Sequence, residues 1–210
     1  MPTQRKAAVI SGDVIGSSVM SLGARKKLQA ELDSFSRLVA KKWPDFKMEQ
    51  YRGDSLQATL TTSRSAALRI GLLMQSALMK EKFSIRLSIG TGEISFRGKN
   101  IITSDGSAFR ASGPYLDLIR KSGEIISVAG NDADFTSEWQ THSASLDYIV
   151  RHWTGQQAEA MYFQLQNFTQ QQMARKLKIT QPSVHQRLHG AGWAVVQKIL
   201  LRFESVIPLL

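Results

Sequence analysis

Residues 47–61 read Lys47-Met-Glu-Gln-Tyr-Arg-Gly-Asp-Ser-Leu-Gln-Ala-Thr-Leu-Thr61. Two extended runs, 47–52 and 56–61, flank the pair Gly53-Asp54. Extended runs joined by so short a polar link are typical of a β-hairpin with a tight turn. The sequence therefore predicts a hairpin in the first third of the chain, and the neighbouring elements can be assigned outward from it.

Upstream of the hairpin, the sequence predicts a strand and then a helix. Residues 7–10 form a short apolar run that ends at Ser-Gly-Asp, as expected for a buried strand. Residues 24–42 place apolar side chains at helical spacing among charged ones, which predicts an amphipathic helix. This helix should end at Trp43, because the residue before a proline avoids helical geometry.

Downstream, Ser63 is expected to cap a second helix. Residues 83–89 then alternate apolar and polar side chains, as in a half-buried strand. Residues 105–121 predict a loop that enters a third helix, and residues 125–128 a further strand. This βαββαβ order predicts an α+β fold, a ferredoxin-like sheet with its helices on one face.

After about residue 135 the strand signals stop and helical patterns replace them. We therefore expect two domains, an α/β domain over residues 1–133 and an all-α domain over residues 134–210. The net charge is +10, and residues 151–210 hold 7 Lys and Arg against only two acidic residues, Glu159 and Glu204. Such an excess favours polyanion binding, although ordinary solubility explains it equally well.

The composition also limits where the protein acts. There is no cysteine, which excludes disulfide scaffolds, thiolate metal sites and cysteine nucleophiles. No apolar run is long enough to span a bilayer, and the apolar run at residues 7–10 is too short for a signal peptide. We expect a soluble cytoplasmic protein with no membrane partner.

The C-terminal part contains a pattern that resembles DNA-binding helix-turn-helix modules, over residues 169–189. Thr154 with Gln157 and Thr169 with Gln172 match capping boxes. Residues 178–180 form the expected tight turn, and Thr180 is placed to cap the second helix. The small residue and the apolar anchors expected to face inward are Met173, Ala174, Leu177, Val184 and Leu188.

The second helix of this pattern leaves side chains exposed that suit base edges in the major groove: Gln181, Ser183, Gln186 and Arg187. Three basic residues, Arg175, Lys176 and Lys178, are expected near DNA phosphates. The alternative is a helical hairpin that only packs or dimerises. The apolar stripe that follows Trp193 predicts the core of this domain or, as the other alternative, a homodimer interface.

Two aspartates occupy turns of the predicted sheet. Asp13 follows the first strand and Asp54 lies at the hairpin tip, and these two places can meet at one edge of a βαββαβ sheet. Two carboxylates there would suit Mg²⁺ or Mn²⁺ with phosphate oxygens, and the turn 14–18 offers backbone amides to phosphate. The alternative is two unrelated turn aspartates. Asp105 is either a third acidic group or a helix cap.

Four motifs together resemble the SatD family, and the helix-turn-helix pattern also fits the layout of that family. They are Gly12-Asp-Val-Ile-Gly-Ser17, Arg52-Gly-Asp-Ser-Leu-Gln57, Arg86-Leu-Ser-Ile-Gly-Thr-Gly-Glu93 and Asp105-Gly-Ser-Ala-Phe-Arg-Ala-Ser112. The first three are also similar to class III nucleotidyl cyclases. That resemblance implies metal binding by Asp13, Asp54 and the carbonyl of Val14. The candidate nucleotide-binding residues are Ile15, Gly16, Ser17, Gly53 and Arg110.

The chain departs from the cyclase pattern where cyclases place their base-reading Lys and their transition-state Asn and Arg. Gln50 occupies the first position, and Phe109 and Gly113 fall in the segment that matches the others. We therefore expect a DNA-binding regulator whose cyclase-like domain senses a metal-bound nucleotide. The alternatives are an enzyme of two-metal phosphoryl or nucleotidyl transfer targeted by its helix-turn-helix, and a scaffold without a metal site.

Overall fold

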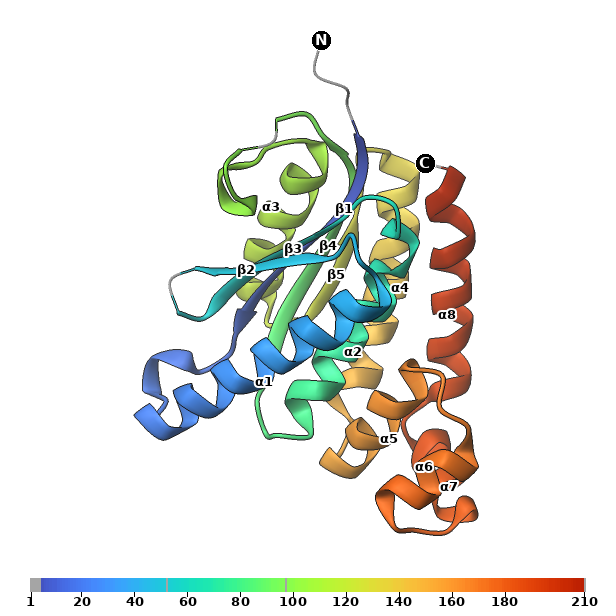
Figure 1. Ribbon diagram of the computed structural model, residues 1–210. Helices are drawn as coiled ribbons and strands as arrows, with labels where there is room; N and C mark the ends of the chain where they lie inside the picture. Colours follow the sequence, from blue (N-terminus) through green and yellow to red (C-terminus); the bar gives the residue numbers. More distant parts are fainter. Residues whose placement is uncertain (1–4, 52, 97, 210) are drawn as a thin grey trace.

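The computed structural model describes residues 5–51, 53–96 and 98–209. It has a mixed α+β fold with one five-stranded sheet in the order β2-β3-β1-β4-β5 (Figure 1). The strands are β1 (Arg5–Val14), β2 (Lys47–Tyr51), β3 (Ser55–Leu60), β4 (Ile85–Ile94) and β5 (Ile126–Ala129). All neighbours are antiparallel except β4 and β5. The predicted hairpin is confirmed as β2 and β3, although Arg52, expected in its first strand, lies outside the described residues.

Helices cover both faces of the sheet, and α1 (Leu22–Lys42) and α2 (Ala67–Met79) share one of them. Ala8 and Ile10 of β1 pack into the core with these two helices, whereas the alternate residues Ala7 and Val9 pack with α3 (Ser107–Ser122). The expectation of helices on one face therefore holds for α1 and α2 but not for α3. The reason lies in Gly90 of β4, where a Cβ atom would overlap the backbone of α3.

The second helix begins differently from the expectation, because Ser63 does not cap it through its side chain. A short 3₁₀ turn, η2 (Arg64–Ala66), precedes α2, and the similar turns η1 (Ser17–Val19), η3 (Ile101–Thr103) and η4 (Ile207–Leu209) lie elsewhere. The segment before this turn is held instead by Asp45, whose Oδ2 accepts hydrogen bonds from the amides of Thr61, Thr62 and Ser63 at 2.8 to 2.9 Å. A carboxylate distant in sequence thus fixes the approach to α2, and it does so through charge-assisted hydrogen bonds.

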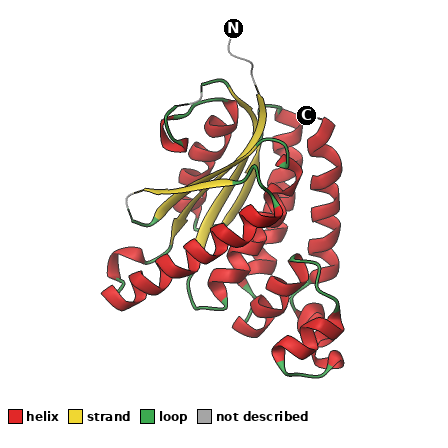
Figure 2. Cartoon of the chain, in the orientation of Figure 1, coloured by secondary structure: helices red, strands yellow, loops and turns green. Residues whose placement is uncertain are grey.

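The C-terminal third is helical (Figure 2). It comprises α4 (Ala133–Arg151), α5 (Gly155–Leu165), α6 (Gln170–Leu177), α7 (Gln181–Gly190) and α8 (Trp193–Val206). The domain boundary expected after residue 133 falls at the start of α4, yet one apolar core runs from the sheet into these helices. The Trp139 ring packs edge-on against Phe203 at 5.0 Å within it. Across the described ranges, no helix combines the length and apolarity needed to cross a bilayer.

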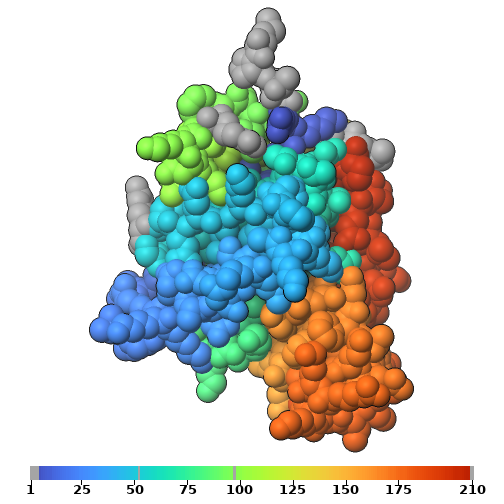
Figure 3. Space-filling model, viewed as in Figure 1, coloured from blue at the N-terminus to red at the C-terminus, as the bar shows by residue number. Residues whose placement is uncertain are grey.

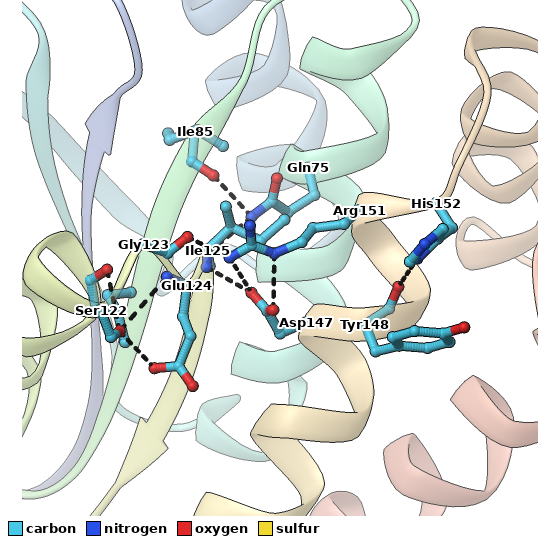
Figure 4. Close-up of polar contacts among 11 residues, drawn as sticks. Gln75, Ile85, Ser122, Gly123, Glu124, Ile125, Asp147, Tyr148, Arg151 and His152 are labelled. Atoms are coloured by element: carbon cyan, nitrogen blue, oxygen red, sulfur yellow. Dashed lines mark hydrogen bonds and ion pairs between the residues drawn. The ribbon is translucent and has the colours of Figure 1, made fainter.

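Polar contacts hold α2 and α4 to the sheet (Figure 4). The Gln75 side chain of α2 is 1% exposed and donates to the carbonyls of Ile85 and Ile125 at 2.9 and 3.1 Å. The Asp147 carboxylate accepts from the amide of Ile125 at 2.6 Å and pairs with Arg151 at 2.7 Å, while Arg151 also donates to the carbonyl of Gly123. The helical part is therefore anchored beside the start of β5 and is not suspended from a linker.

Candidate functional site

The end of β1 and the tip of the hairpin meet at one edge of the sheet, as the sequence predicts. Asp13 lies opposite Ser55 of β3 and opposite Arg86 of β4. The amide of Val14 donates to the carbonyl of Asp54 at 3.0 Å. The two aspartates are therefore close along the backbone, although 41 positions separate them in the sequence (54 − 13).

The Asp13 carboxylate is held by two arginines that sequence reasoning did not select. Its Oδ2 lies 3.3 Å from Arg86 and 3.4 Å from Arg120 of α3, and its side chain is 11% exposed. Among the described residues, the buried Oδ1 of Asp13 and Nε of Arg86 have no hydrogen-bond partner. Two guanidinium groups compensate the buried charge. The Oδ1 atom of Asp13 remains as an unused acceptor and the Nε atom of Arg86 as an unused donor.

Asp54 has a different environment. Its carboxylate accepts hydrogen bonds from the hydroxyl of Ser17 at 2.6 Å and that of Ser55 at 3.4 Å. These hydroxyls are not the groups that hold Asp13. In the described part of the chain, no group of three or more His, Cys, Asp or Glu side chains is placed to hold a metal ion. Two carboxylates alone make a partial site that phosphate oxygens would have to complete, which is the usual way that proteins bind Mg²⁺.

The turn expected to offer amides to phosphate is partly committed to the backbone. The amides of Val14 and Ile15 donate to the carbonyls of Asp54 and Ser84. Gly16 follows with a φ of 73°, where glycine is favoured, and η1 begins at Ser17. Gly53 at the hairpin tip has a φ of 82° for the same reason. What remains for a phosphate at this turn is the segment from Gly16 onward.

We call the place where Asp13 meets Asp54 and the hairpin tip the Asp13 edge. Arg110 does not lie there. It lies near the first turn of α3 and pairs with the exposed carboxylate of Asp105 at 2.7 Å. Arg120 lies ten residues further along α3, which is about 15 Å at the rise of an α-helix, and it is the residue that reaches Asp13. Asp105 accepts from the amide of Gly106 at 2.6 Å, and Phe109 is buried in the core beneath α3.

At the other end of the molecule, α6 and α7 form as their sequence predicts. The capping boxes of Thr154 with Gln157 and Thr169 with Gln172 are both present, and the hydroxyl of Thr180 accepts from the amide of Ser183. Lys178 enables the tight turn with a left-handed φ of 54°. Three of the expected anchors are buried, namely Met173, Val184 and Leu188, while Ala174 and Leu177 are partly buried against the same core.

The exposed stripe of α7 differs from the expected one. Gln181 and Gln186 are exposed as predicted, and the exposed side of the helix also includes His185 and His189. Ser183 is half-buried, and its hydroxyl lies 2.8 Å from that of Thr180.

Arg187 belongs to the contact between α7 and α5. Its side chain is 19% exposed and pairs with Glu159 of α5 at 3.4 Å. The three basic residues expected near phosphates, Arg175, Lys176 and Lys178, are all exposed. In Figure 3 the orange residues form a lobe at the lower right of the molecule.

Comparison with known proteins gives one family and one general likeness. The SatD family matches residues 7–206, and no curated protein matches in sequence. A bacterial light-regulated adenylyl cyclase is 13% identical with a TM-score of 0.47, over 60% of this chain and 77% of that one. The adenylyl cyclase CyaB from P. aeruginosa is 16% identical with a TM-score of 0.43, over 60% and 77%. These values describe a general likeness of fold, and the functional argument rests on this chain's own residues.

Proposed function

We propose that this chain, which belongs to the SatD family, is a DNA-binding regulator with a sensor site for a nucleotide bound to a divalent metal. The observation that carries the proposal is the surface of α6 and α7. Residues 169–192 contain four Lys and Arg and no acidic residue. Their exposed side chains combine amides and imidazoles on one stripe with basic residues beside it.

The stripe of α7 suits the major groove of DNA. Gln181 and Gln186 offer the paired donor and acceptor that match adenine, and His185 adds a further donor or acceptor between them. Arg175, Lys176 and Lys178 lie on α6 and in the turn, where the first helix of such a module contacts phosphates. Arg187 has another role, because its ion pair with Glu159 holds α7 against α5. A homodimer would place two such stripes on paired half-sites.

The DNA proposal is tested by the salt dependence of binding to a labelled duplex of arbitrary sequence. Removal of one basic side chain that neutralises a phosphate should reduce the slope of log affinity against log salt by about 0.9. The double variant Arg175→Gln/Lys178→Gln should therefore reduce it by about 2. Lys47→Gln, an exposed lysine on β2, is the matched control and should leave it unchanged. Equal slopes for all three proteins would remove the DNA interface from α6 and α7.

The sensor proposal rests on the Asp13 edge. The orphaned Oδ1 of Asp13 and the carboxylate of Asp54, which has no cationic partner in the described part of the chain, fit a divalent cation. The resemblance to class III nucleotidyl cyclases adds the backbone carbonyl of Val14 as a further ligand. Mg²⁺ or Mn²⁺ would supply positive charge shared between these oxygens and a phosphate chain. Arg86 and Arg120 are the side chains placed to exchange Asp13 for phosphate oxygens, because guanidinium groups suit both anions.

Strands β2-β3-β1-β4 would then form the ferredoxin-like core of a cyclase-like sensor. The enzyme alternative is weaker at this edge. Gln50 replaces the base-reading Lys. Arg110 pairs with Asp105 near the first turn of α3, away from Asp13. Without donors placed at the developing charge, the transition state of nucleotidyl transfer loses its main stabilisation. Ligand binding without turnover is therefore the expected behaviour.

A thermal-shift screen of nucleoside triphosphates with Mg²⁺ or Mn²⁺ tests the sensor. A ligand present well above its dissociation constant should raise the melting temperature of the wild type by several degrees. Asp54→Ala should abolish that rise, and Asp134→Ala, an exposed aspartate at the start of α4, should keep it. The same shift in all three proteins would place the ligand elsewhere. Pyrophosphate release by the wild type, abolished in Asp54→Ala, would favour the enzyme.

A further inference from the structure

A cavity lies where the end of α1 meets the connection between α5 and α6. Its volume is about 330 Å³, which suits a small molecule. The lining residues are Leu38, Lys41, Lys42, Trp43, Leu73, Gln166 and Phe168. The Asp54 partner Ser17 precedes the start of α1, and α1 is 21 residues or about 30 Å long. This cavity is therefore remote from the Asp13 edge.

The walls of the cavity favour a flat apolar body. Leu38 and Leu73 are aliphatic, and the rings of Trp43 and Phe168 are both partly exposed. Aromatic side chains bind other rings by stacking and edge-to-face packing. The ring of Phe168 also packs against that of Phe163 at 5.4 Å, which holds it in place.

The rim of the cavity carries two lysines, and Glu204, the acidic side chain that acts on Lys42, is itself paired with Arg69 at 2.8 Å. In the described residues, neither Lys41 nor Lys42 forms an ion pair with an acidic side chain; the Nζ of Lys42 instead lies 4.7 Å from the centre of the Trp43 ring. Burial and the charge of Arg69 lower the pKa of Lys42, and the charge of Glu204 offsets them only in part. The Nζ of Lys176 lies 5.3 Å from the ring of Phe168 on the other wall. A bound anion would relieve this accumulation of charge.

We propose that this cavity binds a small flat aromatic anion, such as an aromatic carboxylate or sulfonate. The ring would lie between Trp43 and Phe168, and the anionic group would face Lys41 and Lys42. One wall belongs to α1 and α2 and the other to residues 166–168, which lead directly into α6. A ligand that bridges these walls fixes the position of α6, so this cavity is an effector site independent of Asp13 and Asp54.

The test uses naphthalene-2-sulfonate as the probe and 2-naphthalenemethanol as its uncharged counterpart. Binding is followed by the indole N–H resonance of Trp43, assigned among the four tryptophans by Trp43→Phe. We expect saturable shifts of this resonance by the sulfonate and an affinity at least about tenfold weaker for the alcohol. Lys41→Gln/Lys42→Gln should weaken the sulfonate to a similar degree and leave the alcohol unchanged. Lys26→Gln, an exposed lysine near the other end of α1, is the matched control.

Three results would overturn the proposal. One is equal affinity of the sulfonate and the alcohol, which would show that charge has no part in binding. Another is saturable sulfonate binding that leaves the Trp43 resonance unmoved. The third is sulfonate binding by Lys41→Gln/Lys42→Gln with wild-type affinity, which would place the anionic group elsewhere. Asp54→Ala should bind the sulfonate like the wild type, so failure of the Asp13 sensor site would be seen separately.

Discussion

The α6–α7 region and the Asp13 edge are both polar, but they are built in different ways. In α6 and α7 the capping contacts join residues three apart, as between Thr169 and Gln172 or Thr180 and Ser183. At the Asp13 edge the ion pair with Arg86 spans 73 positions. Local contacts leave side chains free to face solvent, whereas the distant ones neutralise a buried charge. The α6–α7 region is therefore suited to contact another molecule. The Asp13 edge is suited to exchange its internal ion pairs for contacts with a ligand.

The largest effect that separates the two regions is expected from Asp13→Ala. Loss of this carboxylate leaves Arg86, whose side chain is 20% exposed, without its counter-ion in a mostly buried place. We expect a loss of about 3 kcal/mol in the free energy of unfolding, measured by urea denaturation. Asp54→Ala, which removes the acceptor of only two hydroxyl donors, should cost less than about 1 kcal/mol. A cost for Asp13→Ala no greater than that for Asp54→Ala would show that the charge is not buried in solution.

Asp45→Ala should come next, at about 2 kcal/mol, because three amides lose a charged acceptor. Partial burial acts to raise the pKa of Asp45, but the hydrogen bonds from Ser63, Thr61 and Thr62 outweigh it and lower the pKa below its ordinary 3.8. The stabilisation is therefore complete above that value and is lost as the pH falls through the lowered pKa. Urea denaturation between neutral and acidic pH should show the wild type and Asp45→Ala converging in acid. A difference that is constant with pH would contradict the assignment.

Thr169→Ala should have a smaller effect on stability, about 1 kcal/mol, since it removes one cap of a short helix. The loss should appear as faster amide exchange confined to α6, with Gln172 and its neighbours most affected. Exchange that accelerates equally in α6 and in β1 would contradict the local character of this region. Thr169→Ser keeps the hydroxyl and provides the control.

The smallest effect is expected from the ion pair of Arg187 with Glu159. A double-mutant cycle of Arg187→Ala and Glu159→Ala should give a coupling of about 0.5 to 1 kcal/mol in the free energy of unfolding. If Arg187 instead contacts a base, Glu159→Ala should leave DNA affinity unchanged while Arg187→Ala reduces it for one base at one position. That outcome would return Arg187 to the DNA-reading stripe.

The contrast between the regions also explains what the sequence could predict. The hairpin, the strands, both capping boxes and the turn at residues 178–180 follow from spacing within a few residues. The side of the sheet covered by α3 depends on Gly90, whose lack of a side chain has meaning only once α3 is in place. The approach to α2 is fixed by Asp45, which lies 16 to 18 positions before the amides that it accepts from, so spacing around Ser63 could not reveal it.

The Asp13 edge was predictable in its backbone but not in its side chains. Asp13 and Asp54 could be placed together because strand order brings their turns to one edge. Arg120 could not be placed there, because its position depends on how α3 crosses the sheet. From the sequence alone, Arg110 of the same helix was the arginine expected at the site. A signal was available for Arg86, since it begins the motif at residues 86–93 on which the resemblance rests. The exposure of His185 was within reach of the sequence, because the predicted inward faces of Val184 and Leu188 already set the rotation of α7 about its axis.

The most direct measurement is the affinity for a selected DNA duplex, with and without Mg²⁺ and the nucleoside triphosphate found by thermal shift, in the wild type and in Asp54→Ala. If the sheet edge senses a ligand on behalf of α7, the nucleotide should change the wild-type affinity at least about fivefold, and it should leave Asp54→Ala unchanged. Wild-type binding that is indifferent to the nucleotide, or a change of the same size in both proteins, would contradict the coupling of the two regions.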